Sequence, residues 1–365
     1  MLNHKPFGRR LIKVAIQIII IAIVMEIGAR LITENDWFLN TTSQFSSVRW
    51  RLLWIKSHNS SEATNYPIDA YHPLLGWYPI KNSQNVPSSG ALVSFNSDGI
   101  RGQKNYTLDK PPNTSRIVII GDSFTFGEGV NDSDTYAAQL ENLIPNSEVL
   151  NMGVHGYGLD QMALRLRLDG FKYHPDIVIY AFIGDDINRI VLDFRDYMKP
   201  RYILVNNKLK LVNTPITKPE DLLSQSHYSS LIPSALQLMY DRVVYRSYKY
   251  SNLEPLTVAI LKQVVSDTEN HGSIPIILFL PTGQEMTEPL GQKVYGESLM
   301  FLFCKSINIT CFSARSYLVP AFENGNKYNI DINIHYQPIT YWLIANGLAK
   351  DLIAKYPMLQ VQNGH

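Results

Sequence analysis

The sequence predicts an α/β fold with a central parallel sheet. Short apolar runs alternate with segments of helical periodicity, which is typical of a parallel sheet covered by helices. The run 117–120 consists of four consecutive β-branched aliphatic residues, as in a strand buried on both faces. A Gly-Asp-Ser turn follows this run directly, and a glycine cluster follows the next one. Open parallel sheets bind their ligands where strands end, so we expect a site at these turns.

The individual elements follow from the same alternation. The predicted strands are 117–120, 148–151, 177–182, 274–280 and 308–312, and the predicted helices are 135–144, 159–171, 253–271 and 294–306. The segment 201–213 is typical of a hairpin that turns at Asn206-Asn207, and a helix is expected after Pro233. We expect the insert at about 190–252 to be a lid or groove wall, or else a structural flap.

The amino terminus predicts a membrane anchor. Basic residues up to Lys13 precede an apolar stretch that reaches Ile32, about the 20 residues that a membrane span needs. Glu26 and Arg30 are four residues apart and can pair on one helical face. Because no small-x-small cleavage site follows closely, we favour an uncleaved anchor over a signal peptide. The basic flank then stays in the cytoplasm, and the bulk of the chain is periplasmic or at the cell surface.

We therefore expect three regions in the chain. Residues 1–32 form the cytoplasmic tip and the anchor. Residues 33–115, rich in Trp, Asn, Ser and Pro, form a membrane-proximal segment that packs on the α/β domain. Residues 116–357 form this α/β domain. The formal net charge of +1 over 365 residues argues against a nucleic-acid partner.

Ser123 is the candidate nucleophile. At the end of a buried strand its hydroxyl lies in a crevice, and its backbone N–H lies near a helix start that favours negative charge. The alternative is that Asp122 or Ser123 only caps this helix. The sequence GDSFTFGEG resembles block I of the SGNH (GDSL-type) hydrolase superfamily, in which the serine is the nucleophile. This resemblance implies a flavodoxin-like three-layer α/β/α sandwich and a metal-free, cofactor-free ester hydrolase.

The resemblance also implies an oxyanion hole formed by Ser123, Gly153 and Asp185. The glycine that matches Gly153 gives its backbone N–H in the family, although a flexible turn would also explain a glycine here. The family has an asparagine amide where this chain has Asp185, and an ionised carboxylate would oppose an oxyanion. Burial could keep Asp185 protonated as a donor, or Asn188 could supply the amide. The alternative is that Asp185 or Asp186 only caps the helix that follows.

His335 is the candidate general base. It lies just before a helix that Pro338 can start, on a loop able to reach the serine. The family usually places an aspartate two or three residues before this histidine, and here Asp331 lies four residues before it. We expect Asp331 to orient His335 and to stabilise its charged form; Asn333 could also orient the ring, but without a countercharge. Of the other histidines, only His155 lies near one of these motifs.

Together these residues predict a membrane-anchored serine esterase. Its substrate would carry O-acyl or O-acetyl groups, in particular on a cell-surface polysaccharide. An O-acyltransferase would use the same residues, and a non-catalytic glycan-binding or assembly protein is the third hypothesis. The cysteines, Cys304 and Cys311, form a disulfide in an oxidising compartment or remain as two buried thiols.

Overall fold

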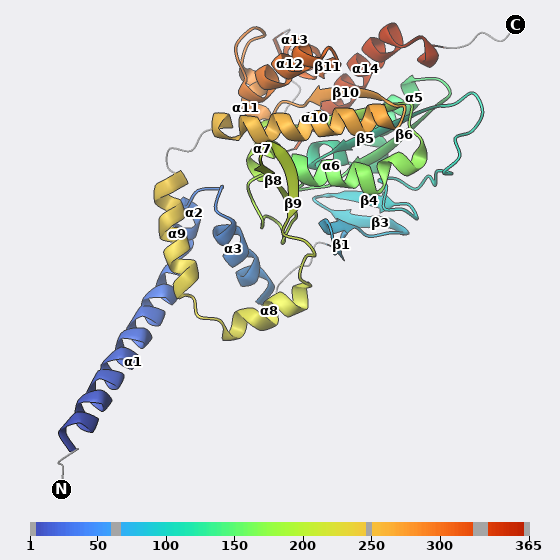
Figure 1. Cartoon of the computed structure of the whole chain (residues 1–365). Helices are drawn as coiled ribbons and strands as arrows, with labels where there is room; N and C mark the ends of the chain where they lie inside the picture. The colour runs from blue at the N-terminus through green and yellow to red at the C-terminus, as the bar shows by residue number, and fades with distance from the viewer. Residues whose placement is uncertain (1–4, 60–66, 246–249, 324–334, 361–365) are drawn as a thin grey trace, which may run out of the picture. The chain divides into compact units, whose positions relative to one another are not determined.

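The computed structural model describes residues 5–59, 67–245, 250–323 and 335–360 (Figure 1). It divides the chain into two compact units. The first unit joins residues 1–63 to 217–248, and the second joins 64–216 to 249–365. The predicted regions 33–115 and 190–252 are therefore each divided between two units. The boundaries of the units depend on which distant segments pack together, and the composition of the sequence does not show this packing.

A five-stranded parallel sheet is the centre of the second unit, as the sequence predicts. Its strands are β5 (Ser115–Gly121), β6 (Ser147–Gly153), β7 (Ile177–Phe182), β10 (Ile274–Phe279) and β11 (Thr310–Ser313). They are ordered β11-β10-β7-β5-β6, which is the doubly wound flavodoxin-like order. Ile120 pairs with Met152 on one side and with Tyr180 on the other, so these three strands end together. The switch point of this sheet lies between β5 and β7.

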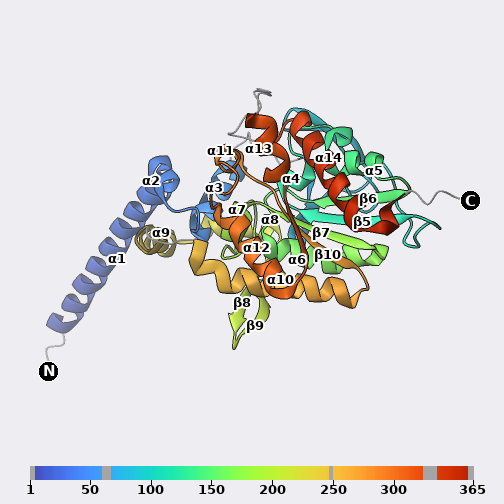
Figure 2. The same ribbon diagram turned by 90° about the horizontal axis from the view of Figure 1, so that it is seen from above.

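Helices cover both faces of the sheet. They are α4 (Ser123–Phe126), α5 (Tyr136–Leu143), α6 (Leu159–Leu168), α7 (Gly184–Arg189), α10 (Glu254–Asn270), α11 (Gly283–Thr287), α12 (Tyr295–Ile307), α13 (Arg315–Glu323) and α14 (Pro338–Lys355). In Figure 2, α5 and α14 lie on one side of the sheet and α6 and α10 on the other. The fold class is thus confirmed as a three-layer α/β/α sandwich.

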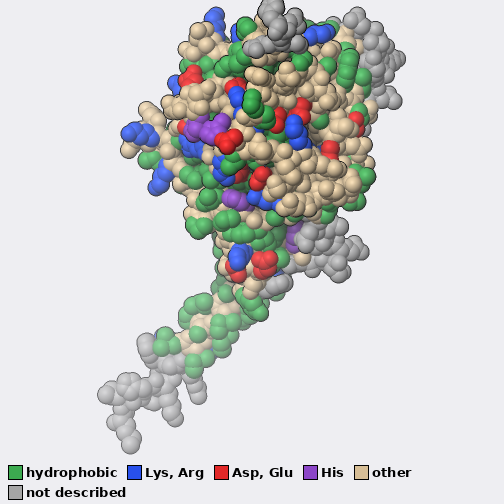
Figure 3. All heavy atoms as spheres, turned by 90° about the vertical axis from the view of Figure 1, so that its right-hand side faces the viewer, with side chains coloured by type: hydrophobic (Ala, Val, Ile, Leu, Met, Phe, Trp, Pro, Cys, Tyr) green, Lys and Arg blue, Asp and Glu red, His purple; other side chains and the backbone are tan. Residues whose placement is uncertain are grey.

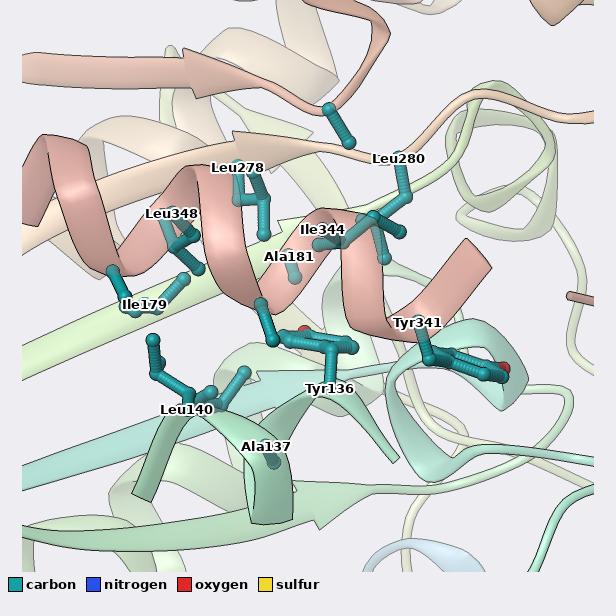
Figure 4. Close-up of a cluster of buried hydrophobic side chains, with 14 of the residues drawn as sticks. Tyr136, Ala137, Leu140, Ile179, Ala181, Leu278, Leu280, Tyr341, Ile344 and Leu348 are labelled. Atoms are coloured by element: carbon teal, nitrogen blue, oxygen red, sulfur yellow. The ribbon is translucent and has the colours of Figure 1, made fainter. Parts of the chain in front are cut away.

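The core between the sheet and α14 explains why the strands read as continuous apolar runs. Ile179 and Leu278 point from the sheet toward Ile344 and Leu348 of α14, and Leu140 of α5 closes the same cluster (Figure 4). Burial of side chains of this size contributes about 1.5–3 kcal/mol each. The same cluster holds α14, and therefore the loop before it, against the edge where β5 ends.

Small antiparallel hairpins extend the second unit. These are β1 (Asp69–His72) with β2 (Gly76–Pro79), β3 (Ser83–Ser88) with β4 (Ala91–Phe95), and β8 (Arg201–Val205) with β9 (Lys208–Val212). The last one turns at Asn206 and Asn207, both with positive φ, as the sequence predicts.

Helices make up the first unit. They are α1 (Lys5–Thr33), α2 (Asp36–Thr41), α3 (Ser47–Asn59), α8 (Pro219–Tyr228) and α9 (Ile232–Val244), the helix expected after Pro233. By length and composition, Arg10–Thr33 of α1 is able to cross a membrane, and hydrophobic side chains cover it (Figure 3). Leu39, Leu52 and Leu238 form the core of the unit. Trp37 of α2 is exposed.

A disulfide joins Cys304 at the end of α12 to Cys311 in β11, with a Cα–Cα distance of 6.2 Å. This resolves the alternatives left by the sequence in favour of the bonded pair.

Candidate active site

The turn after β5 places Ser123 at the switch point of the sheet. Gly121 ends the strand where a Cβ atom would lie 2.1 Å from Thr125 Oγ1, so only glycine lets α4 turn back this closely. Asp122 caps α4 by accepting the N–H of Phe124 at 2.9 Å. Asp122 therefore caps the helix, which was the alternative role proposed for Asp122 or Ser123. The Ser123 hydroxyl has a different partner.

That partner is His335. Its Nε2 atom lies 2.7 Å from Ser123 Oγ, although the residues are 212 positions apart in the chain. The Phe124 ring packs against the imidazole with a centroid distance of 4.9 Å and also contacts Tyr336. Tyr336 in turn donates its hydroxyl to Pro281 O at 2.5 Å, which fixes the loop before α14. The arrangement suits proton transfer from the serine to the imidazole.

The predicted acid, Asp331, and its neutral alternative, Asn333, lie outside the described residues. Among the described side chains, Glu128 is a carboxylate close to the imidazole, with Oε2 3.5 Å from His335 Nε2. Ser89 of the β3–β4 turn donates its hydroxyl to Glu128 Oε1 at 2.9 Å. Glu128 contacts the nitrogen that faces the serine, so it borders the space where a substrate must enter.

Beneath the nucleophile lies a buried cluster of two carboxylates and one guanidinium. Arg189 Nη1 donates to Asp186 Oδ1 at 2.6 Å and to Tyr157 O at 2.9 Å, and lies 3.5 Å from Asp122 Oδ2. Asp186 also accepts the N–H of Ile183 at 3.0 Å. Burial raises the pKa of Asp122, and burial together with the charge of Asp122 raises that of Asp186. The cluster ties the turn after β5 to the turn after β7, since each aspartate belongs to one of them.

Gly153 has a packing reason to be glycine. A Cβ atom there would lie 2.2 Å from Phe126 N, because α4 passes directly over the end of β6. The Gly153 N–H donates to Asn151 Oδ1 at 3.0 Å, and the Asn151 amide donates to Thr125 O at 2.9 Å. An oxyanion contact by Gly153 would therefore have to replace an existing hydrogen bond.

Asp185 lies in the first turn of α7 and is exposed, so the burial expected for it is absent. The amide of Asn188 donates to Asp185 Oδ1 at 3.3 Å, so it is engaged with the carboxylate. Of the predicted oxyanion donors, the backbone N–H of Ser123 remains the simplest to assign.

His155, on the loop after β6, forms a second histidine–carboxylate pair. Its Nε2 atom lies 2.8 and 2.9 Å from the two carboxylate oxygens of Asp69 in β1. Burial alone would lower the pKa of His155, but the negative charges of Asp69, Asp196 and Glu128 raise it to about 9. This pair is therefore an ion pair at neutral pH, and it fastens the hairpin β1–β2 to the loop after β6.

Sequence reasoning missed Glu128, Arg189 and Asp69 as parts of this site. The signal for Glu128 was present, because it lies in the same GDSFTFGEG stretch as the nucleophile. Asp69 carries no such signal, since its partner His155 is 86 positions away. Arg189 pairs locally with Asp186, but its contacts with Tyr157 and Asp122 join distant parts of the chain. Within the described ranges, no three His, Cys, Asp or Glu side chains gather in a way that could hold a metal ion.

No family model matches this chain, and no curated protein does. Several solved structures are similar to it. A protein named as lipolytic, of the G-D-S-L family, from Desulfitobacterium hafniense is 17% identical, covering 65% of this chain and 99% of that one with a TM-score of 0.38. LAE5, an α/β hydrolase from the metagenome of Lake Arreo, is 17% identical. The match covers 67% of this chain and 96% of LAE5, with a TM-score of 0.42.

A catalytic mutant of Axe2, an acetylxylan esterase from Geobacillus stearothermophilus, is also similar. It is 13% identical, covering 67% of this chain and 96% of that one with a TM-score of 0.40. Similarities of this strength say nothing about the activity of this chain, which has to be argued from its own residues.

Proposed function

We propose that this protein is a serine esterase of the SGNH type that acts on O-acyl groups through an acyl-serine intermediate. The distance of 2.7 Å between His335 Nε2 and Ser123 Oγ is the observation that supports it most directly. A nucleophile and a base within hydrogen-bond reach, at the switch point of a doubly wound sheet, are the minimum requirement for this chemistry. The sequence motifs around both residues resemble those of the same superfamily.

In the proposed reaction, Ser123 Oγ attacks the ester carbonyl while its proton passes to His335 Nε2. The backbone N–H of Ser123 at the start of α4 donates to the oxyanion. His335 then protonates the leaving alcohol, and an acyl-serine remains. Water attacks this ester, His335 takes its proton, and the acid leaves as Ser123 regains its hydrogen.

The charges around the serine favour neutral acyl groups. Glu128 lies 3.5 Å from the imidazole, and Asp185 is exposed at the start of α7. Negative charges at these places would repel a substrate that carries a carboxylate or a phosphate near the ester. An acetyl group on a neutral glycan hydroxyl avoids this repulsion, so we propose O-acetylated polysaccharide as the substrate class.

We further propose that α1 anchors the protein and that the second unit is extracytoplasmic. The basic flank before the apolar stretch supports this orientation. The pairing of Cys304 with Cys311 agrees with it, because disulfides persist mainly in oxidising compartments.

The test is hydrolysis of an aryl acetate by the full chain in detergent, together with labelling by a fluorophosphonate. Ser123→Ala should abolish labelling and lower kcat/KM by roughly a thousandfold or more, and His335→Ala should do the same to turnover. The thermal unfolding midpoints of the variants show whether they still fold. Unchanged turnover in Ser123→Ala would refute the proposal. With a glycan acceptor added to the assay, acetylated glycan in place of free acetate would make the enzyme a transferase.

A further inference from the structure

Helix α9 has its charged residues on its packed face. Its buried side chains are Ser234, Ala235, Leu238 and Asp241, and Leu238 packs with the leucines of α2 and α3. Asp241 accepts a hydrogen bond from Ser46 Oγ at 2.5 Å. The carboxylate of Asp241 is therefore hydrogen-bonded within the first unit.

Arg242 is also turned toward the rest of the unit. Its guanidinium lies over the rings of Trp37 and Phe38, at 5.1 and 4.9 Å from their centroids. It also donates to Thr41 Oγ1 at 2.6 Å. Asp241 and Arg242 are the only charged residues of α9, so neither of its charges faces outward.

The opposite face of α9 is apolar and exposed. It carries Leu236, Met239, Tyr240, Val243 and Val244, which we call the outer stripe, with exposed fractions of 62%, 49%, 60%, 75% and 42%. Their spacing of three, four, seven and eight residues places them on one side of the helix. A helix on a water-facing surface shows the reverse distribution, with charged residues outside and apolar residues inside.

The neighbour of α9 indicates what covers the outer stripe. Helix α1 packs along α9 (Figures 1 and 2). Glu26 of α1 accepts the Ser230 hydroxyl at 2.7 Å and the Leu231 N–H at 3.2 Å, so it caps the start of α9. Ile27 and Leu31 of α1 are exposed as well. The end of the candidate membrane span is thus hydrogen-bonded to the helix that carries the outer stripe.

We propose that α9 is a membrane-interface helix whose outer stripe is buried in the lipid bilayer beside α1. This inference rests on the proposal that α1 spans the membrane. The bilayer is the occupant because the stripe adjoins the lipid-exposed surface of the span, has no charge, and contains a tyrosine, a residue enriched at membrane interfaces. The helix gives the first unit a second contact with the membrane, so the anchor cannot rotate freely relative to it.

The experiment uses the full chain in lipid nanodiscs, with one nitroxide label per variant. Because Cys304 and Cys311 are bonded to each other, an engineered cysteine is the one that reacts. Met239→Cys and Val243→Cys report on the outer stripe, and Gln237→Cys reports on the flank of the same helix. Ile20→Cys in α1 reports on the anchor. Power saturation with oxygen and with a water-soluble nickel chelate gives the depth of each label.

We expect the stripe labels at about 5–10 Å below the lipid phosphates, the Gln237 label nearer to water, and the Ile20 label deeper than all of them. If the labels at positions 239 and 243 are as accessible to the nickel chelate as labels in water, while the Ile20 label is deep, the inference about α9 is overturned. The proposal that α1 anchors the protein would then still stand. If the stripe labels are shielded from both reagents and show spin–spin broadening, the outer stripe contacts a second copy of the chain. This result would also overturn the inference. A water-accessible Ile20 label would end both proposals.

Discussion

Asp185 is the residue at which this chain departs from the superfamily it resembles. It is exposed and accepts a hydrogen bond from the amide of Asn188, and it stands where the superfamily has an asparagine. Replacing it with Asn removes a like charge and adds a donor, which we expect to raise kcat on an aryl acetate by roughly ten- to a hundredfold.

The matched control is Asp185→Ala, which removes the charge without adding the donor. A rise in Asp185→Asn that Asp185→Ala does not share would assign the effect to the amide. Equal rises in both variants would assign it to charge alone. A fall in kcat of Asp185→Asn, with the fold intact, would contradict the expectation.

The Asp69–His155 pair makes stability depend on pH. A folded-state pKa of about 9 means that the folded chain holds this proton more tightly than the unfolded chain, whose histidine titrates near its ordinary value of about 6.5. The pair therefore stabilises the fold fully below about pH 6.5 and loses its contribution as the pH rises through about 9. The difference corresponds to a few kcal/mol at most, on the order of 3.

We expect the thermal midpoint of the second unit to fall between pH 6.5 and pH 9.5, and Asp69→Asn to flatten much of that fall. The thermal midpoint is to be measured by circular dichroism across this range. A wild-type profile that remains flat, or an Asp69→Asn profile as steep as wild type, would show that the pair does not carry the dependence. Glu128→Gln is the control, since it removes a charge that affects the pKa of His155 less than Asp69 does.

Among the elements, the segment between α7 and β8 depends on one buried ion pair. Lys199 Nζ donates to Asp160 Oδ2 at 2.6 Å and also lies within 3.2 Å of the carbonyl oxygens of Arg189, Leu192 and Pro200. Both side chains are fully buried. Burial raises the pKa of Asp160 and lowers that of Lys199, and their mutual attraction opposes both changes.

Lys199→Met should lower the free energy of unfolding by about 3–5 kcal/mol, because it leaves the Asp160 carboxylate buried without a cation. The double variant Lys199→Met/Asp160→Leu should recover part of that loss, since it removes the unpaired charge. Denaturant unfolding at pH 7 measures both. A double variant that is less stable than the single one would mean that packing, and not charge, determines the loss.

The elements predicted best from the sequence are those that local composition specifies. The strand 177–182 is apolar throughout because both of its faces are buried, and it matches β7 residue for residue. The pairing of His335 with Ser123 was predicted because both lie next to strand ends or helix starts that the pattern reveals. Lys199 was not predicted, since a lysine on a loop is usually solvated and its acid partner is 39 positions away.

At the scale of the whole molecule, the division into two units could not be predicted. Helix α9 is separated from α1 by about two hundred residues, and its apolar residues match a core helix as well as a lipid-facing one. Ser46 and Asp241 are 195 positions apart, and their hydrogen bond joins the two parts of the first unit. Such pairings depend on tertiary packing, so the insert had to be described as a lid or flap from the sequence alone.

The proposed orientation across the membrane predicts the redox state of the cysteines. If the second unit lies outside the cytoplasm, Cys304 and Cys311 should be oxidised when the full chain is made in a bacterial host. A maleimide-polymer added to the denatured chain should then label no cysteine before reduction and both after it.

Cys311→Ser provides the control, because it leaves Cys304 without a partner and should label once without reduction. Two labelled cysteines in the unreduced wild-type chain would place the second unit in a reducing compartment. That result would contradict the orientation inferred from the basic flank, while leaving the chemistry of Ser123 and His335 untouched, because their contact does not involve α12 or β11.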